Sequence, residues 1–396
     1  MNITSFILLN GLLCLTGIAQ TALPVLALSP SPYLNGMGGS GVALPTPDPF
    51  VIFANPAQIA ANVHSNGVSA HFYPVKASLS DRTTADLRAS AASVGYRIQV
   101  RPNQMGFRIA IGYLNTDLDL GIRTLRDQDG NEIIRTISSE YYYGITLSFA
   151  FEYRILFGFG VTYKWTTSER GYLQRPDGSL ARLRTDMGIF DYGLIAALPV
   201  YDLIFTSGSN FKPFFDISAG FSKINLGEDV SYNGEIDPLP LPKISRVGFA
   251  FSAGLNTKFR GTDLNLIKTD WTREQLDHVG TGTGFENNSS HIFLSNVSGE
   301  ETYFPASRIA AFDVRIFETL SYQQGMYRSD NDEDKTSRGF GITTSGLFKL
   351  LRPKYTRSII SFIFEQMEIS YYQSWYCASS GIESVFYGVN VRVGGF

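Results

Sequence analysis

Large apolar residues alternate with small or polar ones along several stretches of this chain. In ILFGFGVTYKW, residues 155–165, every second residue from Ile155 is apolar or aromatic, and those between are mostly small or polar. Side chains on a β-strand point alternately to opposite faces, so this stretch predicts a strand with one apolar face. The same alternation recurs at 93–100, 105–113, 141–151, 247–255 and 385–393. The chain is therefore predicted to be all-β.

Three features favour a lipid-facing wall over the core face of a soluble sandwich. The predicted strands run to about ten residues, whereas strands of soluble proteins usually have about five or six. Their apolar faces carry aromatic residues near the strand ends, as outer-membrane barrels do. The connections at 101–103 and 152–154 are predicted to be short, and the connections that we predict to be long and polar are 115–138, 166–184, 224–243 and 269–307. Asp129-Gly130 and Asp177-Gly178 predict hairpin turns in the first two, flanked by residues that can extend the strands beyond the membrane.

A sheet in hydrocarbon must close on itself, because every backbone amide needs a partner there. About thirteen strands can be placed along the sequence, and bacterial barrels of this kind have an even number. We therefore predict a transmembrane antiparallel β-barrel of about fourteen strands, surrounded by the lipid of the bacterial outer membrane.

The composition narrows the function. Aromatic residues make up 13% of the chain and charged residues 17%, and the net charge of −3 gives no basis for binding nucleic acid. Four scattered histidines suggest no metal site, and no constellation of residues suggests catalysis or a cofactor. Cys14 and Cys377 are the two cysteines, and no internal disulfide is expected.

The N-terminus resembles a secretory signal over residues 1–27, although Met-Asn-Ile-Thr at its start lacks a basic residue. Small residues place cleavage after Ala19 or after Ala27. Beyond this segment no apolar run is long enough for a membrane helix. The remaining chain divides into residues 28–65, which lack the two-residue period, and the barrel at 66–396.

Residues 33–62 are rich in glycine and contain Asn55-Pro56-Ala57. Asn is a favoured N-cap and Pro a favoured first helical residue, so a short helix is predicted from Asn55 to about Ala61. A compact segment of this kind can pack inside the barrel lumen as a plug or lie outside it on the periplasmic side.

A resemblance to a known superfamily favours the plug. GMGGSGVALPTPDPFVIFANPAQIA, residues 36–60, is similar to the N-terminal signature of FadL-like outer-membrane barrels, in which the matching segment forms a hatch in the lumen of a fourteen-stranded barrel. The residues that match this plug motif are Gly36, Met37, Gly38, Gly39, Gly41, Asp48, Asn55, Pro56 and Ala57.

The superfamily contains two functional groups, and the sequence resembles both. LPLPKISRVGFAFSAGL at 239–255 is similar to a strand entry found in both, and TDWT at 269–272 resembles an element of the fatty-acid and hydrocarbon transporters. GVSAHFYPV at 67–75 and the chain length are closer to the PorV/PorQ-type components of type IX secretion. The resemblance implies either a secretion component that binds a translocon and its cargo proteins, which we favour by a small margin, or a passive transporter of hydrophobic small molecules.

Charged residues on the predicted inward faces have two possible roles. They could line a path that attracts a carboxylate, or they could form salt bridges that tether the plug to the wall, because a charge in a narrow lumen needs a partner. The second role is favoured for these residues, which are Arg97, Arg108, Glu152, Asp216, Asp313, Arg315 and Arg392.

Two further features concern the loops and the C-terminus. The apolar segment 291–297, inside the longest predicted loop, suits partner docking or a ligand mouth equally. The chain ends at Phe396, as barrels recognised by the outer-membrane assembly machinery often do, but Arg392 and Gly394 occupy the preceding positions where that signal is apolar. A bulge at Gly394-Gly395 would restore the expected phase.

Overall fold

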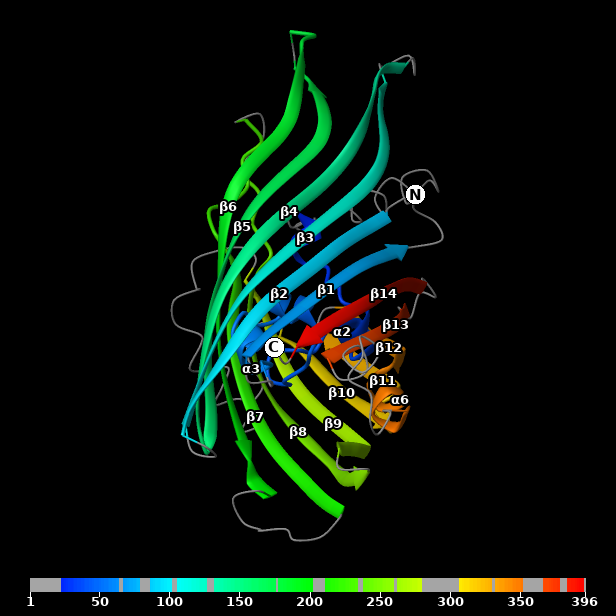
Figure 1. Cartoon of the computed structure of the whole chain (residues 1–396). Coiled ribbons are helices and arrows are strands. Elements are labelled where there is room, and N and C mark those ends of the chain that lie inside the picture. The colour runs from blue at the N-terminus through cyan, green and yellow to red at the C-terminus, as the bar shows by residue number, and fades with distance from the viewer. Residues whose placement is uncertain are drawn as a thin grey trace, which may run out of the picture.

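The computed structural model is a β-barrel that encloses residues 23–63 (Figure 1). The structure describes residues 23–63, 67–78, 86–101, 105–126, 132–175, 177–201, 211–233, 238–259, 262–279, 306–329, 332–351, 366–377 and 383–394.

Fourteen antiparallel strands form one closed sheet, in which each strand pairs with the next along the chain and β1 pairs with β14. This confirms the predicted all-β barrel and its strand number. The strands are β1 Gly67–Ser78, β2 Asp86–Arg101, β3 Met105–Arg126, β4 Glu132–Tyr153, β5 Ile155–Gln174, β6 Leu180–Pro199, β7 Phe211–Leu226, β8 Lys243–Phe259, β9 Thr262–Val279, β10 Ala306–Ile316, β11 Leu320–Ser329, β12 Asp332–Thr343, β13 Met367–Cys377 and β14 Glu383–Gly394.

The aromatic face of β5 points away from the lumen, as its alternation predicts. Phe157 and Phe159 are 55% and 46% exposed, whereas Thr162 and Lys164 on the other face are completely buried. Strands β2, β3 and β4 expose large apolar side chains in the same way. None of the helices among the described residues is long and apolar enough to cross a membrane. A closed barrel with an apolar outer band is the architecture of bacterial outer-membrane proteins, and the chain lies in that membrane.

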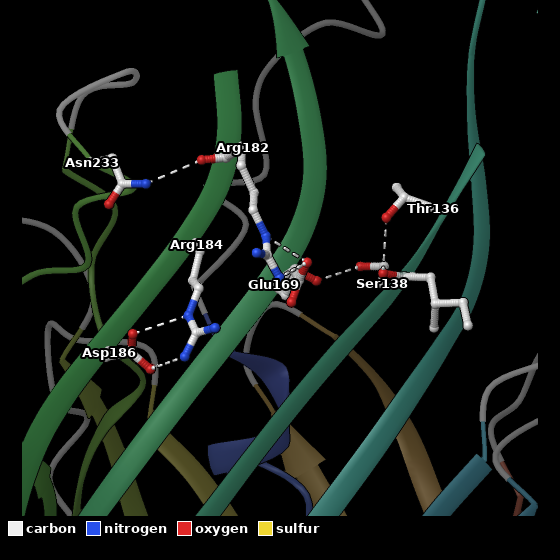
Figure 2. A network of polar contacts seen from close by, with 8 residues as sticks. Thr136, Ser138, Glu169, Arg182, Arg184, Asp186 and Asn233 are labelled. Atoms are coloured by element: carbon white, nitrogen blue, oxygen red, sulfur yellow. Dashed lines mark hydrogen bonds and ion pairs between the residues drawn. The ribbon is translucent and has the colours of Figure 1, made fainter. Parts of the chain in front are cut away.

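An aromatic girdle and a polar network mark the upper boundary of the lipid on β4–β6. Tyr143 stacks on Trp165 with ring centroids 5.1 Å apart. Immediately above them the outer face is polar: Arg182 Nε donates to Glu169 Oε1 at 2.8 Å, and Arg184 Nε lies 3.0 Å from Asp186 Oδ2 (Figure 2). An aromatic girdle followed by ion pairs between outward side chains indicates that β4–β6 have left the hydrocarbon at this height.

Strands β3–β6 are 20 to 22 residues long and extend beyond the lipid. Figure 1 shows them as two hairpins that separate at the top of the barrel. Most of 115–138 and 166–184 is therefore strand and not long connection, and Asp177-Gly178 lies at the turn between β5 and β6, as its hairpin signal predicts. Asp129-Gly130 lies outside the described residues. Outside the membrane a strand no longer needs an apolar outer face, so its alternation disappears while its backbone pairing continues.

The other end of the barrel carries the tightest connections. Arg154 alone joins β4 to β5 with a positive φ of 57°, and residues 317–319 join β10 to β11. Outer-membrane barrels keep short turns on the periplasmic side and longer loops outside, so we assign this end to the periplasm. The helix α6, Ser345–Leu351, follows β12 at the same end.

Residues 23–63 lie inside the barrel, and we call them the plug. The plug contains the short helices η1 Pro24–Leu26, α2 Pro32–Gly36, η2 Pro49–Phe53 and α3 Gln58–Ala61. Helix α2 packs against β11–β14, and α3 packs against β2–β5 (Figure 1). The helix predicted after Asn55 begins three residues later than expected, because Asn55 accepts a hydrogen bond from Ala57 N in a turn that precedes α3.

The first residues of the plug are as buried as its centre. Leu23, Val25 and Leu26 are completely buried. The carbonyl oxygen of Leu26 accepts a hydrogen bond of 3.0 Å from Asn225 Nδ2, and Val25 N donates to Glu140 Oε2 at 3.2 Å. These residues therefore form part of the folded structure.

This burial leads to a prediction about processing. Signal cleavage after Ala27 would remove η1 and its contacts, whereas cleavage after Ala19 keeps them. We expect the mature chain to begin at Gln20, and the intact mass of protein from the outer membrane measures this. A mature chain that begins at Leu28 would contradict it.

Candidate functional site

The plug holds its shape through two side chains of the motif. Asp48 caps η2: its Oδ1 accepts from Phe50 N at 2.8 Å, and its Oδ2 accepts from the Ser31 hydroxyl. Asn55 Nδ2 donates to Val42 O at 2.7 Å, which joins the two halves of the plug. Both side chains are buried, so each bond is made away from water.

The glycine-rich half of the plug is attached to the wall through its backbone. Ser337 Oγ on β12 accepts from Gly38 N at 2.8 Å and donates to Gly36 O at 3.0 Å. Glu274 on β9 accepts from Gly41 N at 2.5 Å and from Val42 N at 2.7 Å. Arg246 on β8 donates to Gly39 O at 2.9 Å. A buried carboxylate that accepts two amide hydrogen bonds forms strong, charge-assisted contacts.

The second half of the plug is attached to the opposite strands. Ser222 on β7 donates to Ala54 O at 2.6 Å, and Ser148 on β4 donates to Ala57 O at 3.1 Å. Arg108 on β3 donates to Ala61 O at 2.5 Å. The plug is therefore bonded to the wall over most of its circumference.

Glycines in the wall allow the plug backbone to approach the strands closely. A Cβ atom added to Gly220 would collide with Val42 O of the plug, one at Gly193 would collide with Asn55 Oδ1, and one at Gly325 would collide with Gly38 N. Further wall glycines whose added Cβ would crowd the plug are Gly95, Gly112, Gly160, Gly248 and Gly339. The glycines on the inward faces of these strands are therefore explained by the plug.

A buried ion pair lies on the extracellular side of the plug. Lys164 Nζ on β5 is 2.7 Å from Asp191 Oδ2 on β6 and donates to Asn225 Oδ1 at 2.9 Å. Lys164 and Asp191 are both fully buried, and the ammonium lies 5.8 Å from the ring centroid of Phe53 in the plug. Asn225 in turn donates to Leu26 O, so this cluster ties β5, β6 and β7 to the start of the plug.

The connection between β7 and β8 covers the plug from outside. Its described residues fold inward, and Val230, Tyr232 and Leu241 are completely buried in the core that the plug forms with the wall. The Tyr232 hydroxyl lies 2.9 Å from Ser168 Oγ on β5. We call residues 227–233 and 238–242 the inward loop.

A chamber of about 1140 Å³ lies between the plug and the periplasmic strand ends. Its walls include plug residues Pro45, Pro47 and Ala61. Six of the seven predicted lumen charges line it, namely Arg97, Arg108, Glu152, Asp216, Arg315 and Arg392.

The chamber charges form pairs across neighbouring strands. Glu152 Oε2 accepts from Arg97 Nη2 at 2.9 Å and from Arg108 Nη2 at 2.7 Å, and Arg392 lies 3.7 Å from Glu368. Arg108 also donates a hydrogen bond to the plug at Ala61 O, and a residue that tethers the plug to the wall needs a contact of this kind.

The seventh predicted charge, Asp313, is fully buried beside the plug. Its Oδ2 is 3.6 Å from Arg315 Nη2 and 3.4 Å from the Tyr33 hydroxyl of the plug. Burial, together with the nearby carboxylates of Asp313 and Asp270, raises the pKa of Tyr33 well above its ordinary value. Tyr33 therefore stays protonated and able to donate to Asp313.

Sequence reasoning missed two residues that bond to the plug backbone and a buried ion pair that holds Asn225 beside the plug. Glu274, Arg246, Lys164 and Asp191 all lie on inward faces. The alternation that selected Arg97 and Arg108 assigns Lys164 to the same face, so the signal was present for this residue. Phe396 and the apolar segment 291–297 lie outside the described residues, and their predicted roles stay predictions.

Burial raises the pKa of Asp48 to about 7 from an ordinary value of 3.8, although the hydrogen bonds from Ser31 and Phe50 lower it. Between these two pH values the folded plug retains a proton that the unfolded chain has released. The free energy of unfolding is therefore expected to fall as the pH rises from about 4 to about 7, and to change no further above that range.

Protease protection of the plug at a series of pH values measures this effect. Asp48→Asn should abolish the pH dependence, because the amide does not titrate. An unchanged dependence in this variant would assign it to another group.

Comparisons with known proteins give similarity at the level of solved structures alone. No protein-family model matches the chain, and no curated protein matches it. The CymD monoaromatic hydrocarbon channel is 12% identical with a TM-score of 0.45, over 92% of this chain and 97% of that one. The Pseudomonas putida toluene transporter TodX is 10% identical with a TM-score of 0.40, over 91% of this chain and 96% of that one.

A Pseudomonas aeruginosa FadL homologue is 10% identical with a TM-score of 0.38, over 91% of this chain and 97% of that one. These structural neighbours are outer-membrane channels of the FadL family. Identities this low do not transfer a substrate from them to this chain.

Proposed function

We propose that the barrel carries small hydrophobic molecules passively across the outer membrane, with the plug as its gate. The observation that carries the proposal is the chamber of about 1140 Å³ between the plug and the periplasmic mouth. Ligand cavities in proteins usually measure about 300–1,000 Å³, so the chamber can hold a small molecule. A barrel that served as a scaffold alone would need no such space behind its plug.

The lumen is filled on the extracellular side of the plug and open on its periplasmic side, which is the arrangement that a gated path requires. On the extracellular side the inward loop and the Lys164–Asp191 pair fill the lumen, and on the periplasmic side the chamber reaches the plug backbone. The periplasmic half of a path is thus already formed. A molecule that enters from outside must displace the inward loop or shift the plug.

The plug contacts are suited to such a shift. Single side chains such as Ser222, Ser148 and Ser337 hold it through hydrogen bonds to its backbone, and each bond contributes about 0.5–1.5 kcal/mol net. A few of these bonds can break together while the rest keep the plug in place. The secretion interpretation would require a partner translocon.

The test uses a plug that can be locked to the wall. Ser222 Oγ lies 2.6 Å from the backbone carbonyl oxygen of Ala54, so the two residues are neighbours. The pair Ala54→Cys/Ser222→Cys is designed to join them by a disulfide, and the loss of free thiols verifies that it has formed. The background variant Cys377→Ser removes the other cysteine of the barrel. Uptake of a hydrophobic naphthylamine dye is then measured in Gram-negative cells that produce each barrel.

The unlocked barrel is expected to raise dye uptake several-fold over cells without it, and oxidation of the cysteine pair should abolish the increase. A reducing agent should restore it, and each single-cysteine variant serves as the matched control. Equal uptake with and without the barrel would refute transport of hydrophobic molecules. Uptake that persists when the pair is oxidised would refute the role of the plug as the gate.

A further inference from the structure

The outer face of β9–β12 carries four arginines toward the lipid. Arg308 on β10 and Arg328 on β11 face each other directly in the strand register. Arg273 on β9 lies opposite Ala310, two residues along β10 from Arg308, and Arg338 on β12 lies opposite Gln324. All four side chains are exposed. We call Arg273, Arg308 and Arg328 the arginine cluster.

Placing these arginines side by side on the outer face is energetically unfavourable unless an anion lies between them. Like charges on directly opposite residues of two strands repel each other. Arg308 is eight residue steps along β10 from its periplasmic end at Ile316, which corresponds to a height of about 20 Å for a strand tilted by about 40°. The apolar band of such a barrel is about 25 Å tall, so the arginine cluster lies inside its upper edge, where an uncompensated arginine destabilises the barrel.

The outward arginines of β6 provide an internal comparison. Arg182 and Arg184 lie above the aromatic girdle, and each has its own carboxylate, Glu169 or Asp186 (Figure 2). In the arginine cluster, Arg328 lies 3.3 Å from Asp334. Neither Arg273 nor Arg308 forms an ion pair with any residue that the structure describes.

Asp277 is a further carboxylate near the arginine cluster. It lies on β9 opposite Ala306 and is 7% exposed.

An apolar groove of about 490 Å³ adjoins the arginine cluster. Its sides are large side chains, including Phe249, Trp271, Phe312 and Met326, and its floor is formed by small residues such as Ala310. Arg273 is one of the lining residues, so the groove and the arginine cluster share a boundary. An apolar groove with a guanidinium among its lining groups matches a molecule with a hydrocarbon chain and an anionic head.

We propose that the outer face of β9–β12 binds one phosphorylated lipid of the outer leaflet. The phosphate lies among Arg273, Arg308 and Arg328, and one acyl chain lies in the groove beside Trp271. Guanidinium groups bind phosphate through paired hydrogen bonds, and a phosphate here neutralises the repulsion between Arg308 and Arg328. The site faces lipid, so it does not depend on whether the lumen transports.

Binding of synthetic diphosphorylated lipid A to the purified, detergent-solubilised barrel tests the proposal. The test variant is Arg273→Gln/Arg308→Gln, and the matched control is Arg182→Gln/Arg184→Gln, which removes two outward arginines that have carboxylate partners. Native mass spectrometry counts the bound lipids and a titration gives their affinity. Heat-modifiability on gels verifies that each variant is folded.

We expect one tightly bound lipid A, an affinity about tenfold lower for each arginine removed from the arginine cluster, and no change in the control. Dephosphorylated lipid A should bind at least tenfold more weakly than the diphosphorylated form. Equal binding by the test variant, or equal binding of the dephosphorylated lipid, would overturn the proposal. Full displacement by inorganic phosphate at similar concentration would also overturn it, because the site would then recognise the free ion and not the lipid.

Discussion

Replacing Lys164 by methionine is expected to destabilise the barrel by about 3–5 kcal/mol. The substitution leaves Asp191 buried without its cation, 2.7 Å from a position that has become apolar. Both residues are fully buried, so water cannot replace the lost partner. The denaturant midpoint at which the barrel loses its heat-resistant band on gels measures the change.

The effect should depend on burial and not on the loss of a lysine as such. The double variant Lys164→Met/Asp191→Leu should recover most of the stability, because no unpaired charge remains. Arg184→Met is the exposed control: its partner Asp186 lies in water, and the expected loss is below about 1 kcal/mol. Equal losses for Lys164→Met and Arg184→Met would contradict our account of the buried pair.

Adding methyl groups at Gly193 and Gly220 is expected to open the lumen. In Gly193→Ala/Gly220→Ala, each new Cβ occupies space that plug atoms now fill, namely Asn55 Oδ1 and Val42 O. The strand backbone is fixed by its two neighbours, so the plug must move instead. We expect a barrel that assembles normally, conducts ions in planar bilayers and admits large antibiotics into cells.

Gly106→Ala provides the matched control on β3. The nearest atom to its added Cβ is Ile98 O at 3.4 Å, which is an ordinary contact, so no opening is expected. Ion conductance no higher in the double variant than in Gly106→Ala would contradict this account. The added methyl groups would then leave the lumen closed, and the wall glycines would not determine the position of the plug.

The sequence was sufficient to predict the parts of this fold that depend on lipid. The alternation in residues 155–165 follows from one face meeting hydrocarbon, and it correctly separates Phe157 from Lys164. The alternation of apolar residues ends above the girdle, where Glu169 and Arg184 pair across β5 and β6, and the hairpin signal Asp177-Gly178 is what indicates that these strands continue. Above the lipid the strands are held by backbone hydrogen bonds, which require no particular side chains.

The contacts of the candidate site could be predicted to a smaller extent. Arg97 and Arg108 are brought together by a tight hairpin, which local sequence indicates. The bond from Gly38 to Ser337 joins residues 299 positions apart, and the register of a whole closed sheet determines it. The alternation in a single sequence predicts which residues point into the lumen. It does not predict which of these residues contact each other across the lumen.

The plug also bears on how the chain folds. Its helix α2 lies against β11–β14, near the end of the sequence, while α3 precedes β1 and lies against β2–β5. Bringing β1 to β14 without help closes a loop of some 300 residues, with an entropic cost of about 5 kcal/mol from its length alone. If the plug docks on β11–β13 before β14 pairs, it brings β1 close to these late strands. Most of the entropic cost of closing the loop is then met at the docking step. The N-terminal segment thus acts as a template that holds the first strand where the last one must add, and the final seam forms as a local event.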